Sequence, residues 1–477
     1  MKALALLTIG LLLASAPRVA AGDEVVVACP RELQPALGRW IAFRQRQGLR
    51  VSIVERVDQA PSLSPLGGEP HGARTVVLVG DGGAVGPPMA RAPARAVHRY
   101  GPEQSIATDA LLAAPAAPVT VGRLPFTDAR SLGEYLDRVI QRETRPANWG
   151  DTRLQIAAGA GGFGPLADAA IEGAARRVLI ELAPSASELS FQRIDGAAPA
   201  VPRPNDNGQP PRRGGVWVWL GHGLRDRLPG VNPADLARLT GGADIAVLLA
   251  CYAGDTAAPG LGVVEQLLSA SEGPLAVVAS TGVSMPYGNA RLGAALLAGC
   301  EGARQPSAGR WLADARAATL APAGTPLLQG LDSLARLLGP GDATLDDERQ
   351  DHARLYQLMG DPLLAIGRAA PMESVAEPRV APGGAVTVRG RAPIRGRLRL
   401  TVKRASRPDL PAVARVEQPV AAGQRFELAA PLEDLVRRGE LIARLGVEGP
   451  DGLAVASHRV RVEAAPRTAS TGVATAR

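Results

Sequence analysis

Short apolar runs alternate with helical repeats through the first part of the chain. Val25–Ala28, Val51–Val54 and Thr75–Val79 are rich in β-branched residues and predict buried strands. Apolar residues recur at helical spacing in two sets: Leu33, Leu37, Trp40 and Ile41 and, later, Leu132, Leu136, Val139 and Ile140. Gly48 follows the first set where a glycine commonly ends a helix. This alternation predicts a mostly parallel sheet covered by helices on both faces.

The same alternation begins again near Asp151. The strands predicted there are Leu154–Ala158, Val216–Leu220, Ile245–Ala250 and Leu275–Ala279. Helices are predicted over two stretches, Leu261–Ala270 and Gly309–Leu320. Residues 197–213 are rich in proline, asparagine and glycine and predict an exposed loop. A second α/β segment therefore follows the first.

The pattern changes after about Ala370. Apolar residues then alternate with polar ones at a period of two, at Val386 and Val388, at Leu398, Leu400 and Val402, at Phe426 and Leu428, and at Val460 and Val462. Turns such as Pro382-Gly383-Gly384 separate these stretches. Such patterning is typical of a small antiparallel β-sandwich.

The N-terminus has the features of a secretory signal peptide. Lys2 precedes an apolar run from Ala3 to Leu13, and small residues ending in Val19-Ala20-Ala21 complete the cleavage pattern. We expect cleavage near Ala21 and export from the cytoplasm. The run is shorter than the ~20 apolar residues that span a membrane, and no second long run follows, so no membrane span is expected.

These patterns divide the chain into five expected parts. Residues 1–21 form the signal peptide, 22–148 an N-terminal α/β subdomain, and 149–370 a second α/β subdomain that carries the candidate chemistry. Residues 371–465 form the sandwich. Residues 466–477 are expected to be a disordered tail.

Composition and charge narrow the class of protein. The chain has 46% hydrophobic and 21% charged residues, as globular proteins do. Its net charge of +7 comes from arginines that are dispersed along the chain. Because a nucleic-acid surface needs basic residues clustered on one face, we expect no nucleic-acid partner. Of the three cysteines, Cys29 and Cys300 could form a disulfide and leave Cys251 free, but the sequence leaves that pairing open.

Two reactive side chains directly follow predicted strands. Val216–Leu220 leads into Gly221-His222-Gly223, and Ile245–Ala250 leads into Cys251. Since the carboxyl ends of parallel strands border the ligand crevice, both side chains are expected at one edge of the sheet, on neighbouring strands. An imidazole beside a thiol can take its proton and later return it to a leaving amine. The amides of Gly223 and Cys251 are then candidates for holding the oxyanion.

Each of these signals also has an ordinary structural explanation. A cysteine after an apolar strand is commonly a small buried hydrophobe, and a His-Gly pair is commonly a turn. Their position at the ends of consecutive strands is what favours catalysis. The five histidines and three cysteines show no metal-ligand spacing, and Gly159–Gly164 fits no nucleotide-binding fingerprint. We therefore predict no required cofactor and no catalytic metal, and the sequence shows no sign of a structural calcium ion.

At these residues the chain resembles the gingipain-like cysteine peptidases, which form family C25 of the caspase-like clan. The resemblance covers most of the stretch from Asp23 to Gly367. Besides His222-Gly223 and Ala250-Cys251, it rests on segments in the family's order: Val25–Pro30, Leu78–Asp81, Val121–Pro125 and Tyr356–Pro362. It implies a caspase-like, mostly parallel sheet flanked by helices, in two α/β subdomains, followed by an immunoglobulin-like β-sandwich.

The resemblance also implies roles for the two reactive residues. Cys251 would attack the peptide carbonyl, and His222 would protonate the leaving group. Some relatives carry a carboxylate that orients the histidine, at a position where this chain has Ala160. A His–Cys pair without that carboxylate can still perform the chemistry.

Four residues are candidates for the substrate pocket by the same analogy. Asp168 is the nearest acid that could enter the pocket, although a helix cap explains it equally well. Ser280, Thr281 and Met285 follow the strand after the cysteine strand and are candidates for a pocket wall.

The leading interpretation is an exported cysteine endopeptidase that acts on proteins or peptides. Two alternatives stay open. The chain could be a catalytically inactive member that serves in export, surface assembly or binding, which the alanine at position 160 favours. It could also be a transpeptidase that uses the same His222–Cys251 pair.

Overall fold

A computed structural model describes most of the 477-residue chain. The described residues are 24–56, 74–82, 88–96, 103–112, 119–159, 173, 188–194, 213–257, 260–300, 306–338, 344–366, 369–407, 410–433 and 438–463. The expected signal peptide, the tail and all but the last residue of the loop at 197–213 lie outside these ranges. The chain forms two compact units, Met1–Ala370 and Pro371–Arg477, which are described in turn.

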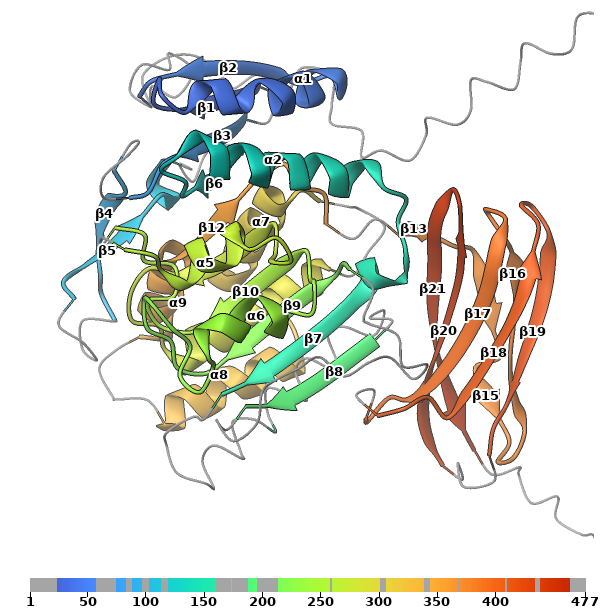
Figure 1. Ribbon diagram of the computed structural model, residues 1–477. Coiled ribbons are helices and arrows are strands. Elements are labelled where there is room, and N and C mark those ends of the chain that lie inside the picture. The colour runs from blue at the N-terminus through green and yellow to red at the C-terminus, as the bar shows by residue number, and fades with distance from the viewer. Residues whose placement is uncertain are drawn as a thin grey trace, which may run out of the picture. The chain divides into compact units, whose positions relative to one another are not determined.

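The first unit alternates strands and helices (Figure 1). Its strands are β1 (Glu24–Ala28), β2 (Arg50–Val54), β3 (Arg74–Val79), β4 (Ala90–Pro93), β5 (Ser105–Thr108), β6 (Val119–Leu124), β7 (Arg153–Ala158), β8 (Glu188–Arg193), β9 (Val216–Leu220), β10 (Ile245–Leu249), β11 (Ala276–Ser280) and β12 (Tyr356–Gly360). Its helices are α1 (Gly38–Arg46), α2 (Ala129–Thr144), α4 (Leu236–Leu239), α5 (Val263–Ser269), α6 (Pro286–Gly299), α7 (Ala308–Leu320), α8 (Pro326–Leu338) and α9 (Leu345–Leu355).

Ten of the described strands form one sheet in the order β2-β1-β3-β6-β12-β11-β10-β9-β7-β8. Its pairings are mostly parallel, and β12 runs antiparallel to β11. The sheet continues across the expected subdomain boundary at 148/149, because β12 pairs with β11 on one side and with β6 on the other. This is the mostly parallel, helix-flanked α/β fold that the sequence predicts.

The helices of the first unit pack in two groups. In one group α2 contacts both α1 and α5. In the other group α6 and α9 contact each other and both α7 and α8. Side-chain caps start several of them: Asp128 accepts from Ser131 N at 2.8 Å before α2, and Ser307 Oγ accepts from Arg310 N at 3.3 Å before α7. The helices predicted over 261–270 and 309–320 correspond to α5 and α7.

The core is built from the apolar positions that the sequence identifies. Val25 and Val27 of β1 lie on one face of the sheet in the large core cluster, while Ala28 joins a smaller cluster with Val76 and Leu78. The large cluster continues through the central strands, where Trp217 and Trp219 are almost fully buried. Both tryptophans lie on β9, between β10 and β7.

Several elements were not predicted from the sequence. These are β4, β5, β6, β8 and β12 among the strands and α4, α6, α8 and α9 among the helices. The segment Tyr356–Pro362 is recognisable as a family motif, but its insertion between β6 and β11 depends on pairing with residues far away in the chain. Local periodicity carries no information on such pairing.

The second unit consists of mostly antiparallel sheets. Its strands are β13 (Ala370–Pro371), β14 (Ser374–Ala376), β15 (Arg379–Val380), β16 (Ala385–Arg391), β17 (Gly396–Arg404), β18 (Ala414–Val420), β19 (Arg425–Pro431), β20 (Gly439–Gly449) and β21 (Gly452–Val462). One sheet has the order β13-β21-β20-β17-β18 with β15 beside β21, and the other has the order β14-β16-β19. All of the period-two apolar residues named above are buried. The immunoglobulin-like character of this unit stays a prediction.

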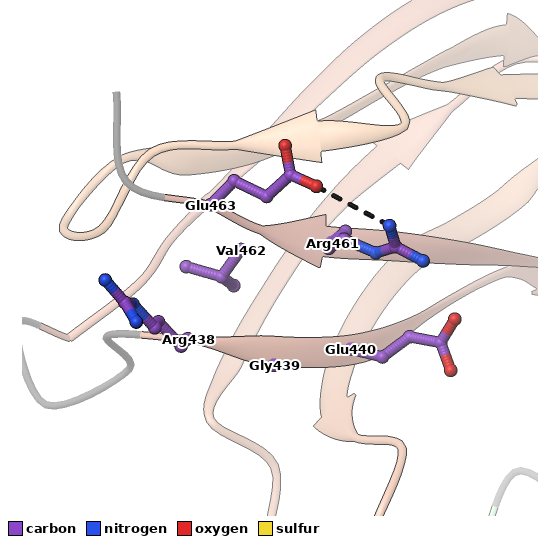
Figure 2. A pocket seen from close by; sticks show the side chains of 6 residues that line it. All are labelled: Arg438, Gly439, Glu440, Arg461, Val462 and Glu463. Atoms are coloured by element: carbon purple, nitrogen blue, oxygen red, sulfur yellow. Dashed lines mark ion pairs between the residues drawn. The ribbon is translucent and has the colours of Figure 1, made fainter. Parts of the chain in front are cut away.

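A pocket lies where β20 begins and β21 ends (Figure 2). It is lined by Arg438, Gly439, Glu440, Arg461, Val462 and Glu463. Charges of both signs line it, and Arg461 pairs with Glu463 at 3.6 Å. None of the residues that the sequence marks for catalysis or substrate binding lies there, so the candidate site is in the first unit.

Candidate active site

His222 and Cys251 follow neighbouring parallel strands. In the β9–β10 pair, Leu220 is in register with Leu249, so both strands reach the same edge of the sheet together. Beyond them, Gly221 N donates to Leu249 O at 3.4 Å. The His222 side chain is exposed and Cys251 is partly exposed, so both are open to solvent. The neighbouring strands that the sequence predicts are present.

Gly223 brings the backbone after His222 against the backbone of Cys251. A Cβ atom at position 223 would lie 2.6 Å from Cys251 O and 2.8 Å from the Ala250 Cβ, closer than any side chain can approach. Trp219 Nε1 on β9 donates to His222 O at 3.0 Å, and this hydrogen bond fixes the turn that carries His222 to the strand before it. The glycine is therefore required by the close approach of the two loops.

The two amides expected to hold an oxyanion lie in this contact. The position of a Gly223 Cβ would be 3.5 Å from Cys251 N. Among the described residues, no backbone carbonyl accepts a hydrogen bond from the amide of Gly223 or of Cys251. Both donors are thus uncommitted to the backbone, which an oxyanion-binding site requires.

In the described parts of the chain, the hydrogen bonds of the Cys251 sulfur are all made with Ser284. Ser284 N donates to Sγ at 3.3 Å, and Ser284 Oγ donates to Sγ at 3.8 Å. In the neutral form, the thiol donates to Ser284 O at 3.5 Å. Ser284 is buried, in the segment between β11 and α6. Position 284 carried no signal in the sequence that connected it with Cys251.

Two further polar residues continue from Ser284 into the protein. Asn289 Nδ2 donates to Ser284 Oγ at 3.1 Å, and Tyr356 OH donates to Asn289 Oδ1 at 2.6 Å. Tyr356 is completely buried at the start of β12. Burial raises the pKa of its phenol far above the ordinary value, so the group stays neutral and keeps its proton.

The segment that carries Ser284 is fixed at both ends. Tyr252 N donates to Gly282 O at 2.9 Å, which ties the segment to the residue after Cys251. On the other side Met285 N donates to His352 Nε2 at 2.8 Å, and His352 Nδ1 lies 2.8 Å from Glu348 O. Burial lowers the pKa of His352 to about 4, so its Nε2 is a hydrogen-bond acceptor near neutral pH.

The chain turns sharply after Cys251. Tyr252 has a φ of 56°, the only positive φ of a non-glycine residue in the described parts of the chain. Such a conformation costs about 1–3 kcal/mol and needs support from its surroundings. The Tyr252 phenol donates to the Glu103 carboxylate, and burial raises the pKa of Glu103. Glu103 therefore lies close to the candidate site, which the sequence did not indicate.

The residues predicted for the substrate pocket are placed unequally. Ser280 and Thr281 are buried, and their hydroxyls donate to Gly282 O at 2.7 Å and to Ala107 O at 2.6 Å. Met285 is partly buried at the start of α6. Asp168 lies outside the described residues, as does the alanine at position 160. The role of Asp168, Ser280, Thr281 and Met285 in substrate binding stays a prediction.

All three cysteines are free thiols. Cys29 and Cys300, whose pairing the sequence left open, form no disulfide. Cys29 is buried, and desolvation raises the pKa of its thiol to about 12, so it does not react as a thiolate at neutral pH. Cys300 is partly exposed at the C-terminal end of α6. Cys251 is thus one of two cysteines accessible to reagents.

Within the described ranges, no three His, Cys, Asp or Glu side chains are grouped as metal ligands. The role of a structural calcium ion therefore stays untested.

None of the described helices is both long and apolar enough to cross a membrane.

The fold and this edge of the sheet define an α/β protein of the caspase-like type with a cysteine at the end of a central strand. Residues 20–367 match peptidase family C25. The match covers more than half of the chain, and the chain belongs to this family of cysteine peptidases. No curated protein sequence matches the chain.

Several solved structures are similar in fold to this chain. The crystal structure of the Arg-specific cysteine proteinase gingipain R (RgpB) has a TM-score of 0.53 and 16% identity, with 94% of this chain and 100% of that chain covered. A structure described only as a protease has a TM-score of 0.51 and 10% identity, over 93% and 98% of the two chains. The complex of Porphyromonas gingivalis RgpB pro- and mature domains matches at 0.49 and 16% identity, over 92% and 100%.

Proposed function

We propose that the chain is an exported cysteine endopeptidase that hydrolyses peptide bonds in proteins or peptides, with Cys251 as nucleophile and His222 as general acid and base. The observation that carries the proposal is the contact of Gly223 with the backbone of Cys251, at the ends of adjacent parallel strands in a family C25 chain. Export is proposed from the N-terminal sequence alone.

The proposed reaction has two halves. The Cys251 sulfur gives its proton to the His222 imidazole and attacks the substrate carbonyl carbon. The carbonyl oxygen becomes negative and accepts hydrogen bonds from the amides of Gly223 and Cys251. His222 returns the proton to the leaving amine as the C–N bond breaks, which leaves a thioester on Cys251. A water molecule then attacks the thioester, again with His222 as base, and the acid product leaves.

Substrate recognition is proposed at the same edge of the sheet. Asp168, Ser280, Thr281 and Met285 are the candidates, by analogy with the family. The buried hydroxyls of Ser280 and Thr281 support a role in shaping the loop, since both are bonded to backbone carbonyls. The proposed chemistry needs no cofactor, because thiol, imidazole and backbone amides supply every proton and charge that it uses.

Replacing the nucleophile tests this proposal. We expect Cys251→Ala to abolish cleavage of a peptide library, because no other thiolate is available at this edge of the sheet. Cys300→Ala is the matched control and should retain activity, since it removes the other accessible thiol. Cleavage by the Cys251→Ala variant at the unchanged rate would rule out the proposed nucleophile.

An inactive family member is the second candidate, favoured by the alanine at position 160 in place of the carboxylate of some relatives. Such a protein would serve in export, surface assembly or binding. It would cleave no peptide in the library, even when Cys251 is intact. A transpeptidase would instead join an added amine to the acyl group, and mass analysis of the products distinguishes it from a hydrolase.

A further inference from the structure

The polar chain behind Cys251 has a defined direction. Tyr356 OH donates to Asn289 Oδ1 at 2.6 Å, so the amide of Asn289 turns its Nδ2 group toward Ser284 Oγ at 3.1 Å. The Ser284 oxygen accepts that bond, and its own proton is then directed to Cys251 Sγ at 3.8 Å. In this chain each group donates to the next one toward the sulfur, and Tyr356 also interacts directly with the Ser284 side chain.

The sulfur receives a second donor from the same residue. Ser284 N lies 3.3 Å from Sγ and its N–H points at the sulfur. When Cys251 is neutral, its proton is donated to Ser284 O at 3.5 Å. When the sulfur is ionised, it accepts hydrogen bonds from both the N–H and the hydroxyl of Ser284. Donors to a charged group favour the charged form.

The position of these groups suits a fixed role. Ser284 and Tyr356 are buried, and Asn289 lies in the first turn of α6, whose first residue is Pro286. The next amide along the chain, that of Met285, is held by the buried imidazole of His352. The donors are therefore set in place before the sulfur ionises, and no reorganisation is needed during the reaction.

We propose that Ser284, Asn289 and Tyr356 form a hydrogen-bond relay that orients and stabilises the ionised sulfur of Cys251. Ser284 contacts the reacting sulfur, and Asn289 and Tyr356 are positioning residues that act through Ser284. The inference deepens the proposed function, on which it rests for its role in peptide cleavage. The relay stabilises the nucleophile through residues of the α6 segment and β12. It does not depend on the histidine-orienting carboxylate that some relatives carry where this chain has Ala160.

Alkylation of the full-length chain by iodoacetamide tests the relay without any substrate, because only the thiolate reacts fast. The rate is measured at a series of pH values and read separately for the peptides that contain Cys251 and Cys300. Cys300 is the internal reference, since it is accessible and lies at the far end of α6. Cys29 is buried and contributes little.

Ser284→Ala removes the hydroxyl donor and should slow alkylation of Cys251 about tenfold near neutral pH, relative to Cys300. Asn289→Asp should act in the same direction, because a carboxylate accepts from both Tyr356 and Ser284 and withdraws the serine proton from the sulfur. Tyr356→Phe should slow the alkylation of Cys251 to a smaller extent.

Tyr135→Phe is the matched control for the tyrosine variant. Tyr135 is equally buried and donates to Leu275 O at 2.6 Å, but it does not belong to the relay. Its profile should equal that of the wild type. The relay is overturned if Ser284→Ala and Asn289→Asp leave the profile of Cys251 unchanged, or if Tyr135→Phe moves it as much as Tyr356→Phe. If Tyr356→Phe does not fold, the milder substitution Ser284→Ala still tests whether the relay acts on Cys251.

Peptide cleavage measured on the same samples separates this inference from the proposed function. If Ser284→Ala changes the alkylation of Cys251 but the wild type cleaves no peptide, the relay is supported and the proposed peptidase activity is overturned. Cleavage that depends on Cys251, together with unchanged profiles, would leave the peptidase standing and overturn the relay.

Discussion

At the scale of single residues, the candidate site depends on one close backbone contact. Gly223 has no space for a side chain, because Cys251 O and the Ala250 Cβ already occupy it. The same contact places His222 and Cys251, the two residues proposed for catalysis, in one local structure. A substitution at Gly223 should therefore affect the chemistry although its side chain has no chemical role.

Gly223→Ala should lower kcat/KM for peptide cleavage by about a hundredfold, because a displacement of the two loops misaligns nucleophile and base. Moving the backbone apart should also lower the free energy of unfolding by about 1–3 kcal/mol. Enzyme kinetics and urea unfolding measure the two effects.

Gly133→Ala provides the comparison for that variant. Gly133 lies within α2, and the nearest atom to an added Cβ is the Ala36 Cβ at 4.0 Å. The substitution should stabilise the protein by about 0.5–1 kcal/mol and leave cleavage unchanged. Equal activities for Gly223→Ala and wild type would contradict the importance assigned to the close contact.

The sequence predicted the two reactive residues but not the groups around the sulfur. His222 and Cys251 each follow a recognisable apolar strand. It is a general rule that ligands bind at the edge where parallel strands have their carboxyl ends. Ser284, Asn289 and Tyr356 come from a loop, a helix and a strand, and their meeting depends on how these elements pack. Position 284 has no local pattern that distinguishes it from any other serine in a loop.

At the scale of elements, β12 holds the two halves of the large sheet together. Its last residue, Gly360, is followed by Asp361, which is fully buried. Asp361 Oδ2 accepts from Arg44 Nη2 at 2.6 Å and from Trp40 Nε1 at 2.6 Å, both on α1. The family motif Tyr356–Pro362 thus begins with a residue of the relay and contains, just before its final proline, a carboxylate that anchors a helix.

Asp361→Ala should lower the free energy of unfolding by about 3–5 kcal/mol, because it leaves the buried Arg44 guanidinium with one carboxylate fewer. Glu143 remains as a partner of Arg44 at 2.7 Å, so the effect should fall short of complete unfolding. Urea denaturation measures the change.

Asp137→Ala is the control for that measurement. Asp137 pairs with Arg39 of α1 at 2.6 Å, but both side chains are exposed. Removing an exposed pair should change the free energy of unfolding by about 0–1 kcal/mol. A loss of the same size in both variants would contradict the anchoring role of Asp361.

Sequence periodicity predicted the type of many elements, helix or strand, more readily than it predicted the order of the strands in the sheet. The strands at 25–28 and 245–250 and the helix at 132–140 are apolar runs or repeats that local patterns identify. β12 is different, since it is a short strand directly after α9. Its Tyr356 pairs with Ser280, 76 positions earlier, and its Met359 pairs with Arg123, still farther away. Only the packed sheet determines that order.

At the scale of the whole molecule, the chain separates into an α/β unit and a β unit whose cores are different in kind. The sequence indicated this change, because helical spacing gives way to period-two alternation near Ala370. The five tryptophans, Trp40, Trp149, Trp217, Trp219 and Trp311, all belong to the first unit. Intrinsic tryptophan fluorescence therefore reports on one unit alone.

This distribution allows the independence of the units to be tested. A chain that ends after Ala370 should show the same urea midpoint by tryptophan fluorescence as the full chain, because every fluorophore and its core are retained. Far-UV circular dichroism of the full chain should contain an added β component that follows its own transition. A midpoint that falls clearly on truncation would mean that the two units unfold together. In that case the sandwich would be a stabilising part of the α/β unit, and variants of its strands should then lower the stability of the site around Cys251.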